Sequence, residues 1–191
     1  MRAKRQFSFK KAALGLLLLA PLPAGAAEWH VEGGASTIEF DYIAAGSQWT
    51  GAFPAFSGEG RFDPANPAAS ALALEIDIAA IDLGWAPASA LARGDAWFDV
   101  ADHPKGSFRL DKVERLGPDI WRAEGALTLR GVTRPMEARL KLTFGPDGAR
   151  ATGSTRIDRR DFGIGAGVSG ALAPVGDTVQ VRFDLLARSA D

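Results

Sequence analysis

The sequence contains no cysteine and only two histidines, His30 and His103, among its 191 residues. The absence of cysteine excludes a disulfide scaffold, a thiol nucleophile, an iron–sulfur cluster, a Cys-ligated zinc site and a lipid-modified N-terminal cysteine. Two histidines cannot form a multi-histidine metal site within one chain. Nucleophile elbows, phosphate loops and zinc-ligand spacings are missing as well. We therefore expect no catalytic residues, no metal and no cofactor.

Charge runs and low-complexity stretches are also missing. Charged residues make up 24% of the chain and hydrophobic residues 47%, which is the balance of an ordinary globular protein. The length suits one domain and is too short for two comfortable ones. The 22 glycines and 11 prolines indicate many turns, which favours strands over long helices.

The N-terminus departs from this even composition. Its first segment holds five basic residues and no acidic one: Arg2, Lys4, Arg5, Lys10 and Lys11. An apolar run over residues 12–20 follows, and Ala24-Gly25-Ala26 then supplies the small residues of a cleavage site. This order is typical of a cleaved secretory signal peptide, and the run is shorter than the roughly 20 residues that span a bilayer. We predict a signal peptide over residues 1–26 and a single mature domain over residues 27–191.

Cleavage would change the formal charge from −1 to −6, because it removes five basic residues and no acidic one. An acidic mature domain argues against nucleic acid and against anionic membrane surfaces as main partners. The exported domain has no disulfides, so its stability must come from a buried core.

Alternation of apolar and polar residues dominates the mature chain and predicts strands with one wet and one apolar face. The clearest alternation covers residues 38–42, 72–78, 136–144 and 179–185, and weaker strands are expected over 49–62, 107–116, 120–130 and 149–157. Gly145-Pro146-Asp147-Gly148 separates two of these runs and predicts a tight hairpin. The sequence thus predicts an all-β chain of eight antiparallel strands.

Residues 86–98 lack this alternation. Pro87 near the start and Gly94 near the end predict a short helical segment there. Eight antiparallel strands must avoid free edges, and closure into a barrel with the helix over one opening does so economically. A two-sheet sandwich is the alternative that the pattern leaves open.

The predicted inward rows are almost wholly apolar, and two aromatic residues outside the rows, one at the end of the helical segment and one in a late loop, extend the candidate lining. The full set is Ile38, Phe40, Phe53, Phe62, Leu74, Ile76, Ile78, Phe98, Phe108, Leu127, Leu129, Leu140, Leu142, Phe162, Val181 and Phe183. Small residues interrupt these rows at Gly58, Gly60, Ala123, Gly125, Ala138, Ala151 and Gly153. They provide either barrel curvature and packing or room for a ligand. A cavity with such walls would select a long hydrocarbon.

Short motifs occur in a fixed order along residues 29–187. They are Trp29-His30-Val31, Ser36-Thr37-Ile38-Glu39-Phe40, Gly51-Ala52-Phe53, residues 56–63, Asp95-Ala96-Trp97-Phe98-Asp99 with His103-Pro104 and Phe108, residues 125–133 and residues 157–165. In order and spacing the chain resembles the YceI-like family of exported, polyisoprenoid-binding, lipocalin-like barrels.

The resemblance implies an eight-stranded antiparallel lipocalin-like barrel with a lipid along its axis, and a periplasmic location. It implies a long-chain apolar lipid or isoprenoid quinone as partner, transient contact with a membrane or a membrane cytochrome, and a homodimer. The sequence departs from many relatives where they carry histidines, because Ala35, Ala44 and Ala45 stand at those positions.

Polar and aromatic candidates outside the rows have two interpretations each. The charged segment Arg159-Arg160-Asp161 is interpreted as a salt-bridged turn. The less favoured interpretation is a site that binds the anionic headgroup of a lipid. Two roles suit the aromatic residues Trp85, Trp97 and Phe98 equally well. They could form a lid over the cavity, or they could be the core contact that docks the helix. His103 is expected in a loop, and His30 is expected to face solvent on the first strand.

Three functions follow from this sequence. The first is a periplasmic barrel that encapsulates a lipid for transport, storage or quinone metabolism. The second is an interaction or stress-protective module whose side chains fill the barrel. The third is an enzyme acting on a lipid or quinone, which would need a perturbed ionisable group inside the barrel.

The signal peptide can be tested on exported protein. We expect the mature N-terminus at Ala27 or Glu28, because the small residues before these bonds suit cleavage. Mass spectrometry of the periplasmic fraction checks this, and the Ala24→Lys/Ala26→Lys variant should retain its leader. Exported wild-type protein that begins at Met1 would contradict the prediction.

Overall fold

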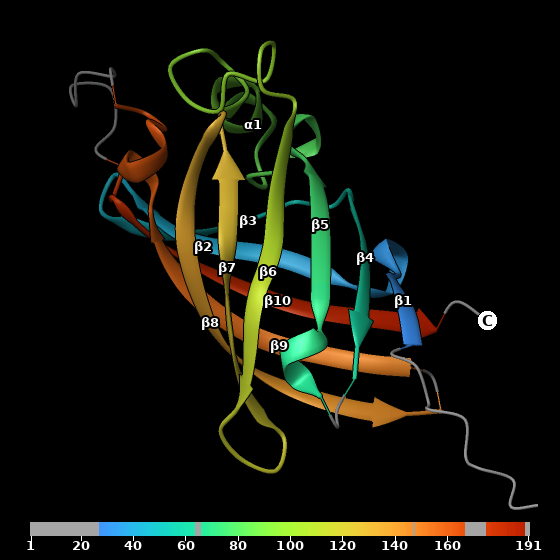
Figure 1. Cartoon of the computed structure of the whole chain (residues 1–191). Coiled ribbons are helices and arrows are strands. Elements are labelled where there is room, and N and C mark those ends of the chain that lie inside the picture. Colours follow the sequence, from blue (N-terminus) through green and yellow to red (C-terminus); the bar gives the residue numbers. More distant parts are fainter. Residues whose placement is uncertain (1–26, 64–65, 147, 167–174, 190–191) are drawn as a thin grey trace, which may run out of the picture.

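The computed structural model describes residues 27–63, 66–146, 148–166 and 175–189 (Figure 1). The predicted signal peptide, apart from its boundary with Ala27, lies outside the described residues. The strands are β1 (Ala27–Val31), β2 (Thr37–Ala44), β3 (Ser47–Ala52), β4 (Phe56–Phe62), β5 (Ala71–Asp77), β6 (Lys105–Arg115), β7 (Ile120–Leu129), β8 (Val132–Gly145), β9 (Gly148–Asp158) and β10 (Thr178–Ser189). The helices are α1 (Ala86–Ala92) and the 3-10 turns η1 (Gly33–Ala35), η2 (Pro67–Ala69), η3 (Ile78–Ala80) and η4 (Arg159–Phe162).

The sheet closes on itself. Its order is β1-β4-β5-β6-β7-β8-β9-β10-β2-β3, and β10 pairs back with β1. β10 meets β2 through residues 180–184 and β1 through residues 187–189, so β1 and β2 share one position in the ring. All pairings of the described strands are antiparallel. The predicted eight-stranded antiparallel barrel is therefore confirmed, and the sandwich is excluded.

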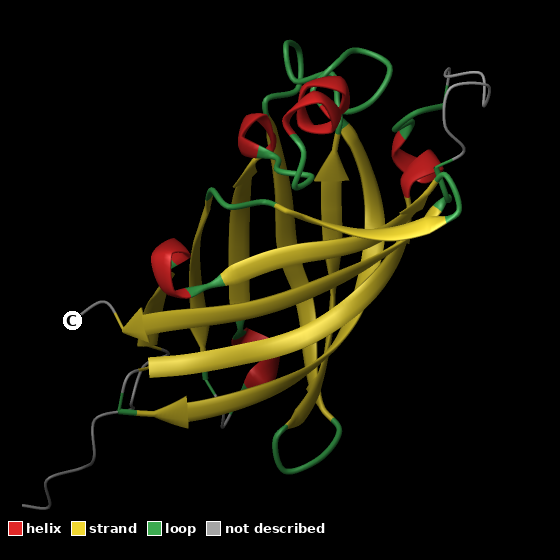
Figure 2. Ribbon diagram, turned by 180° about the vertical axis from the view of Figure 1, so that it is seen from behind, coloured by secondary structure: helices red, strands yellow, loops and turns green. Residues whose placement is uncertain are grey.

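The helical elements gather mainly at the ends of the barrel. In both views α1 and η3 lie at the uppermost end (Figures 1 and 2). The predicted helix near 86–98 is present but ends at Ala92, and Trp97 and Phe98 follow it in turns. Among the described residues, no helix is long and apolar enough to cross a membrane.

Two predicted strands end differently in the structure. The single strand expected over 49–62 is two strands, β3 and β4, because Pro54 between them has no N–H for a ladder. The strand expected to reach Ile78 stops at Asp77. The Asp77 carboxylate accepts a hydrogen bond from the Ala79 backbone N–H at 3.0 Å and starts η3.

Strand β7 shows why the inward rows can be predicted. Trp121, Ala123, Gly125, Leu127 and Leu129 are buried, whereas the residues that alternate with them are half-buried on the outer face. On that outer face, Arg122 pairs with a carboxylate of β6 at 2.7 Å. Side chains alternate across a strand, so an apolar row on one face must point into the closed barrel.

Several strand glycines serve packing. A Cβ added to Gly153 would lie 2.6 Å from the Phe183 ring, and one added to Gly51 would lie 2.5 Å from the Phe40 ring. The rings occupy the space over these glycines, so the packing interpretation holds at Gly153, and Gly51, which was not among the predicted small residues, is packed in the same way. Gly60 lines the cavity described below, but it too is closely packed, because an added Cβ would lie 2.6 Å from the Ala71 carbonyl oxygen.

The packing role predicts the effect of a single methyl group. In Gly153→Ala, the new Cβ would lie 2.5 Å from a backbone carbonyl oxygen as well as against Phe183. We expect a loss of about 1–3 kcal/mol in the free energy of unfolding, measured by urea denaturation. Gly34→Ala is the matched control, because nothing lies within 4 Å of its added Cβ. Equal stability of the two variants would contradict this account.

Candidate functional site

The inside of the barrel holds two adjoining cavities. The inner cavity has a volume of about 230 Å³, and the mouth cavity, under α1, about 610 Å³. Phe53, Leu129, Ile157 and Val181 line both. The two cavities therefore form neighbouring parts of one axial space.

The wall of the inner cavity is apolar along nearly its whole surface. Of its polar side chains, Thr155 donates its hydroxyl to the Glu137 carbonyl oxygen at 2.6 Å, and Arg61 is exposed. Within the described part of the chain, the Trp29 indole N–H and the Ser70 hydroxyl are buried without a partner. Such a wall offers water few hydrogen bonds, which favours an apolar guest.

Aromatic rings pack at the end of the inner cavity away from α1. Trp29 and Phe62 line the cavity. The Phe62 ring stacks on Phe144 at 5.6 Å and meets Trp121 edge-on at 5.5 Å. Such contacts each add about 0.5–1.5 kcal/mol beyond the buried area, so this end is firmly packed.

The mouth cavity is also mainly apolar, but it is rimmed by exposed rings. Trp49 is 50% exposed, Trp85 65% and Leu91 62%, and all three line the cavity. Among the described residues that line this cavity, Tyr42 and Arg159 carry titratable groups. Burial raises the pKa of the Tyr42 hydroxyl, so this group stays neutral at physiological pH.

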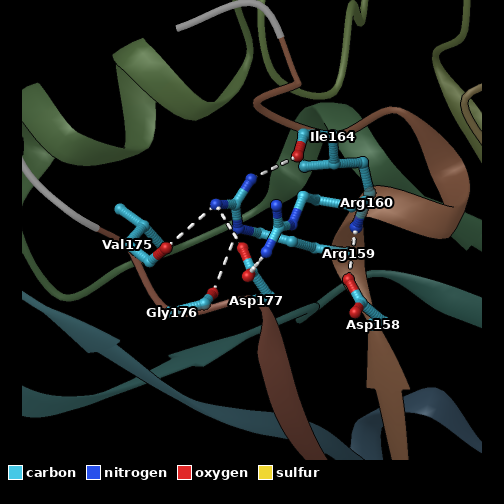
Figure 3. A network of polar contacts seen from close by, with 7 residues as sticks. All are labelled: Asp158, Arg159, Arg160, Ile164, Val175, Gly176 and Asp177. Carbon is cyan, nitrogen blue, oxygen red and sulfur yellow. Dashed lines mark hydrogen bonds and ion pairs between the residues drawn. The ribbon is translucent and has the colours of Figure 1, made fainter. Parts of the chain in front are cut away.

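Arg159 connects η4 to the segment before β10 (Figure 3). Its guanidinium donates to the carbonyl oxygens of Gly176 at 3.0 Å, Ile164 at 2.7 Å and Val175 at 2.9 Å, and to the Asp177 carboxylate at 3.0 Å. The Arg159 side chain is 12% exposed. Burial, and then the charge of the neighbouring arginine, lower the pKa of the Arg159 guanidinium. Most donors of this arginine are used within the chain itself.

These contacts decide between the two interpretations of the 159–161 segment. Arg159 and Arg160 both pair with Asp177, so the predicted salt-bridged turn is present. Its acidic partner is Asp177 rather than Asp161, which is exposed. Gly163 ends η4 at a φ of 71°, a left-handed conformation that favours glycine.

Two more arginines hold the loops at this end in the same way. Arg93, after α1, donates to carbonyl oxygens at η3 and its C-cap at 2.7 and 2.9 Å. Arg130 donates to the carbonyl oxygens of Gly163 at 2.5 Å and Asp95 at 2.7 Å. We call Arg93, Arg130 and Arg159 the arginine clamps. Sequence reasoning missed the first two, because carbonyl partners leave no pattern in a sequence.

The structure brings most of the predicted lining residues together. The inner cavity contains Ile38, Phe53, Phe62, Leu74, Ile76, Phe108, Leu127, Leu129, Leu140, Leu142, Val181 and Phe183. The mouth cavity adds Phe40 and Phe98. Ile78 and Phe162 line neither cavity; they are 1% and 2% exposed and pack within the core.

Other lining residues were not predicted. Tyr42, Trp49 and Leu91 line the mouth cavity, and Ile157 lines both. Tyr42 and Ile157 continue predicted apolar rows, so the alternation could have identified them. Trp49 and Leu91 lie in short segments around the mouth. The alternation of apolar and polar residues does not show there which side chains face the cavity.

The model of the YceI-like domain matches residues 29–187. The chain belongs to the YceI-like family. A UPF0312 protein of Azotobacter vinelandii is 33% identical over 161 residues, covering 80% of this YceI-like chain and 84% of the relative. A UPF0312 protein of Shewanella putrefaciens is 30% identical over 162 residues, covering 80% and 85%.

Solved structures share the fold of this YceI-like chain. Burkholderia cenocepacia BcnA matches with a TM-score of 0.77 and 26% identity, over 83% of this chain and 99% of BcnA. A polyisoprenoid binding domain from Saccharophagus degradans matches with a TM-score of 0.69 and 17% identity, over 86% and 99%. The second likeness shows the fold alone.

The arginine clamps predict a stability effect. Arg159→Ala would leave three backbone carbonyl oxygens without their donor and would remove one of the two arginine partners of Asp177. We expect a loss of about 3 kcal/mol in the free energy of unfolding, measured by urea denaturation. The control is Arg188→Ala, whose exposed pair with Glu32 should contribute about 1 kcal/mol or less. A loss for Arg159→Ala no larger than the control's would contradict the clamp.

Proposed function

We propose that the protein binds a long apolar lipid, of the polyisoprenoid or isoprenoid-quinone type, inside the barrel. The observation that carries the proposal is the axial space itself. Two apolar cavities adjoin through Phe53, Leu129, Ile157 and Val181. An elongated space with apolar walls suits a chain molecule better than a compact polar one.

The energy of binding would come from burial of the hydrocarbon. Each methylene group moved out of water contributes about 0.8 kcal/mol, so a long chain needs no charged anchor to bind well. Length and width of the axial space would then set the selectivity. The aromatic rings at the inner end and the arginine clamps at the mouth would limit both.

Membership of the YceI-like family supports a binding function. The neighbour from Saccharophagus degradans is itself a polyisoprenoid binding domain, and we extend that ligand class to this chain as part of the proposal. A periplasmic location and a role in lipid transport, storage or quinone metabolism complete it.

Binding is favoured over catalysis by the chemistry of the walls. An enzyme acting inside the barrel would need an acid, base or metal there. Among the described residues, no cluster of three or more His, Asp or Glu could hold a metal ion. Tyr42 stays protonated, and Arg159 is engaged by the backbone. The cavities in turn weigh against a barrel filled by its own side chains.

Organic extraction of purified mature protein followed by mass spectrometry tests the proposal. We expect a co-purifying isoprenoid lipid in the wild type and at least a tenfold smaller amount in Ala123→Leu/Ala151→Leu. Both alanines line the inner cavity, so the added side chains would occupy the space of the ligand.

The matched control is Ala126→Leu. Ala126 lies on β7 on the outer face, between the inward residues, so the same added volume should leave the lipid content unchanged. Circular dichroism checks the fold of all variants. Wild-type protein that is reproducibly empty, and takes up neither added quinone nor polyprenol, would overturn the proposal.

A further inference from the structure

The rim of the mouth cavity exposes large apolar side chains from two segments. Trp49 lies on β3, Trp85 caps α1 and Leu91 lies on α1. Each is at least half exposed, and all three line the same cavity. We define these three side chains as the mouth patch. An apolar patch around a cavity opening is a feature of interaction sites.

The segments that carry the mouth patch have no charge. Residues 42–53 and 83–92 contain no Asp, Glu, Lys or Arg, although charged residues make up 24% of the whole chain. The flanking acids are engaged: Asp41 pairs with Arg182 at 2.9 Å, and the Asp82 carboxylate accepts from the Gly84 N–H at 2.8 Å. The patch could therefore enter a water-poor layer without stripping water from an ion.

The opposite end of the barrel differs in charge. Leu116 and Ile120 are 43% and 41% exposed there. However, Arg115, Asp119 and Lys141 lie beside them, and the last two pair at 3.0 Å. Both ends thus expose apolar side chains, but the mouth patch lies on segments without a charged residue, whereas charged side chains lie directly beside Leu116 and Ile120.

We propose that the mouth patch docks on the surface of a phospholipid bilayer. Tryptophan favours the membrane–water interface, where its ring is apolar and its N–H stays wet. The mouth cavity opens between the docked side chains, so a lipid would pass from the bilayer into the barrel without crossing water. The inference rests on the proposed function and identifies the surface from which the ligand comes.

Flotation with vesicles of phosphatidylcholine alone tests the docking. We expect wild-type protein to float with the vesicles, and Trp85→Asp/Leu91→Asp to show at least a tenfold weaker partitioning. Both side chains are more than 60% exposed, so the substitutions should leave the fold intact, which circular dichroism checks. The matched control is Leu116→Asp/Ile120→Asp at the opposite end, which should float like the wild type.

Three results would overturn the docking. One is wild-type protein that does not float, including the case in which gel filtration shows that it is a dimer. Another is flotation that survives in Trp85→Asp/Leu91→Asp. The third is flotation lost in the control variant. Lipid extraction on the same wild-type preparation keeps the two proposals separate, because protein that carries lipid but fails to float contradicts only the docking.

Discussion

Closure of the sheet by β10 is the constraint on which the remaining structure depends. One edge of β10 pairs with β9 over ten residue pairs, and the other meets β2 and then β1. Because β10 closes the ring, alternate residues of the strands that form it face one common axis. Apolar rows that would be buried between two layers in a sandwich here surround an axial space. The cavity is thus a consequence of the closure together with the small residues in the rows.

The two ends of this axial space are built from different interactions. Aromatic rings around Phe62 pack against one another at the inner end, and the arginine clamps hold the loops at the mouth. The clamps bind carbonyl oxygens that have no partner in regular secondary structure, so charge there organises the backbone. The polar chemistry of the mouth therefore supports the walls, while the surface offered to a guest remains apolar.

Much of this could be predicted from the sequence, because the alternation of apolar and polar residues along a strand shows which side chains point into the barrel. The inward residues of β7 and β8, the hairpin between Gly145 and Gly148, and the exposure of His30 all follow from the pattern. The pattern failed where backbone geometry or distant contacts decide. Pro54 divides a predicted strand, and Phe162 is drawn into the core from a 3-10 turn. Asp177 pairs with arginines 17 and 18 residues away, which no local pattern reveals.

A high-resolution crystal structure of the mature protein, purified without detergent, tests the central claim most directly. The account predicts one continuous elongated density along the axis, from Leu142 in the inner cavity past Phe53 and Val181 to Trp85 at the rim. Side chains of the inward rows that meet on the axis and fill it would contradict the claim. So would a cavity occupied by ordered water, since that would show walls able to hydrogen-bond a polar guest.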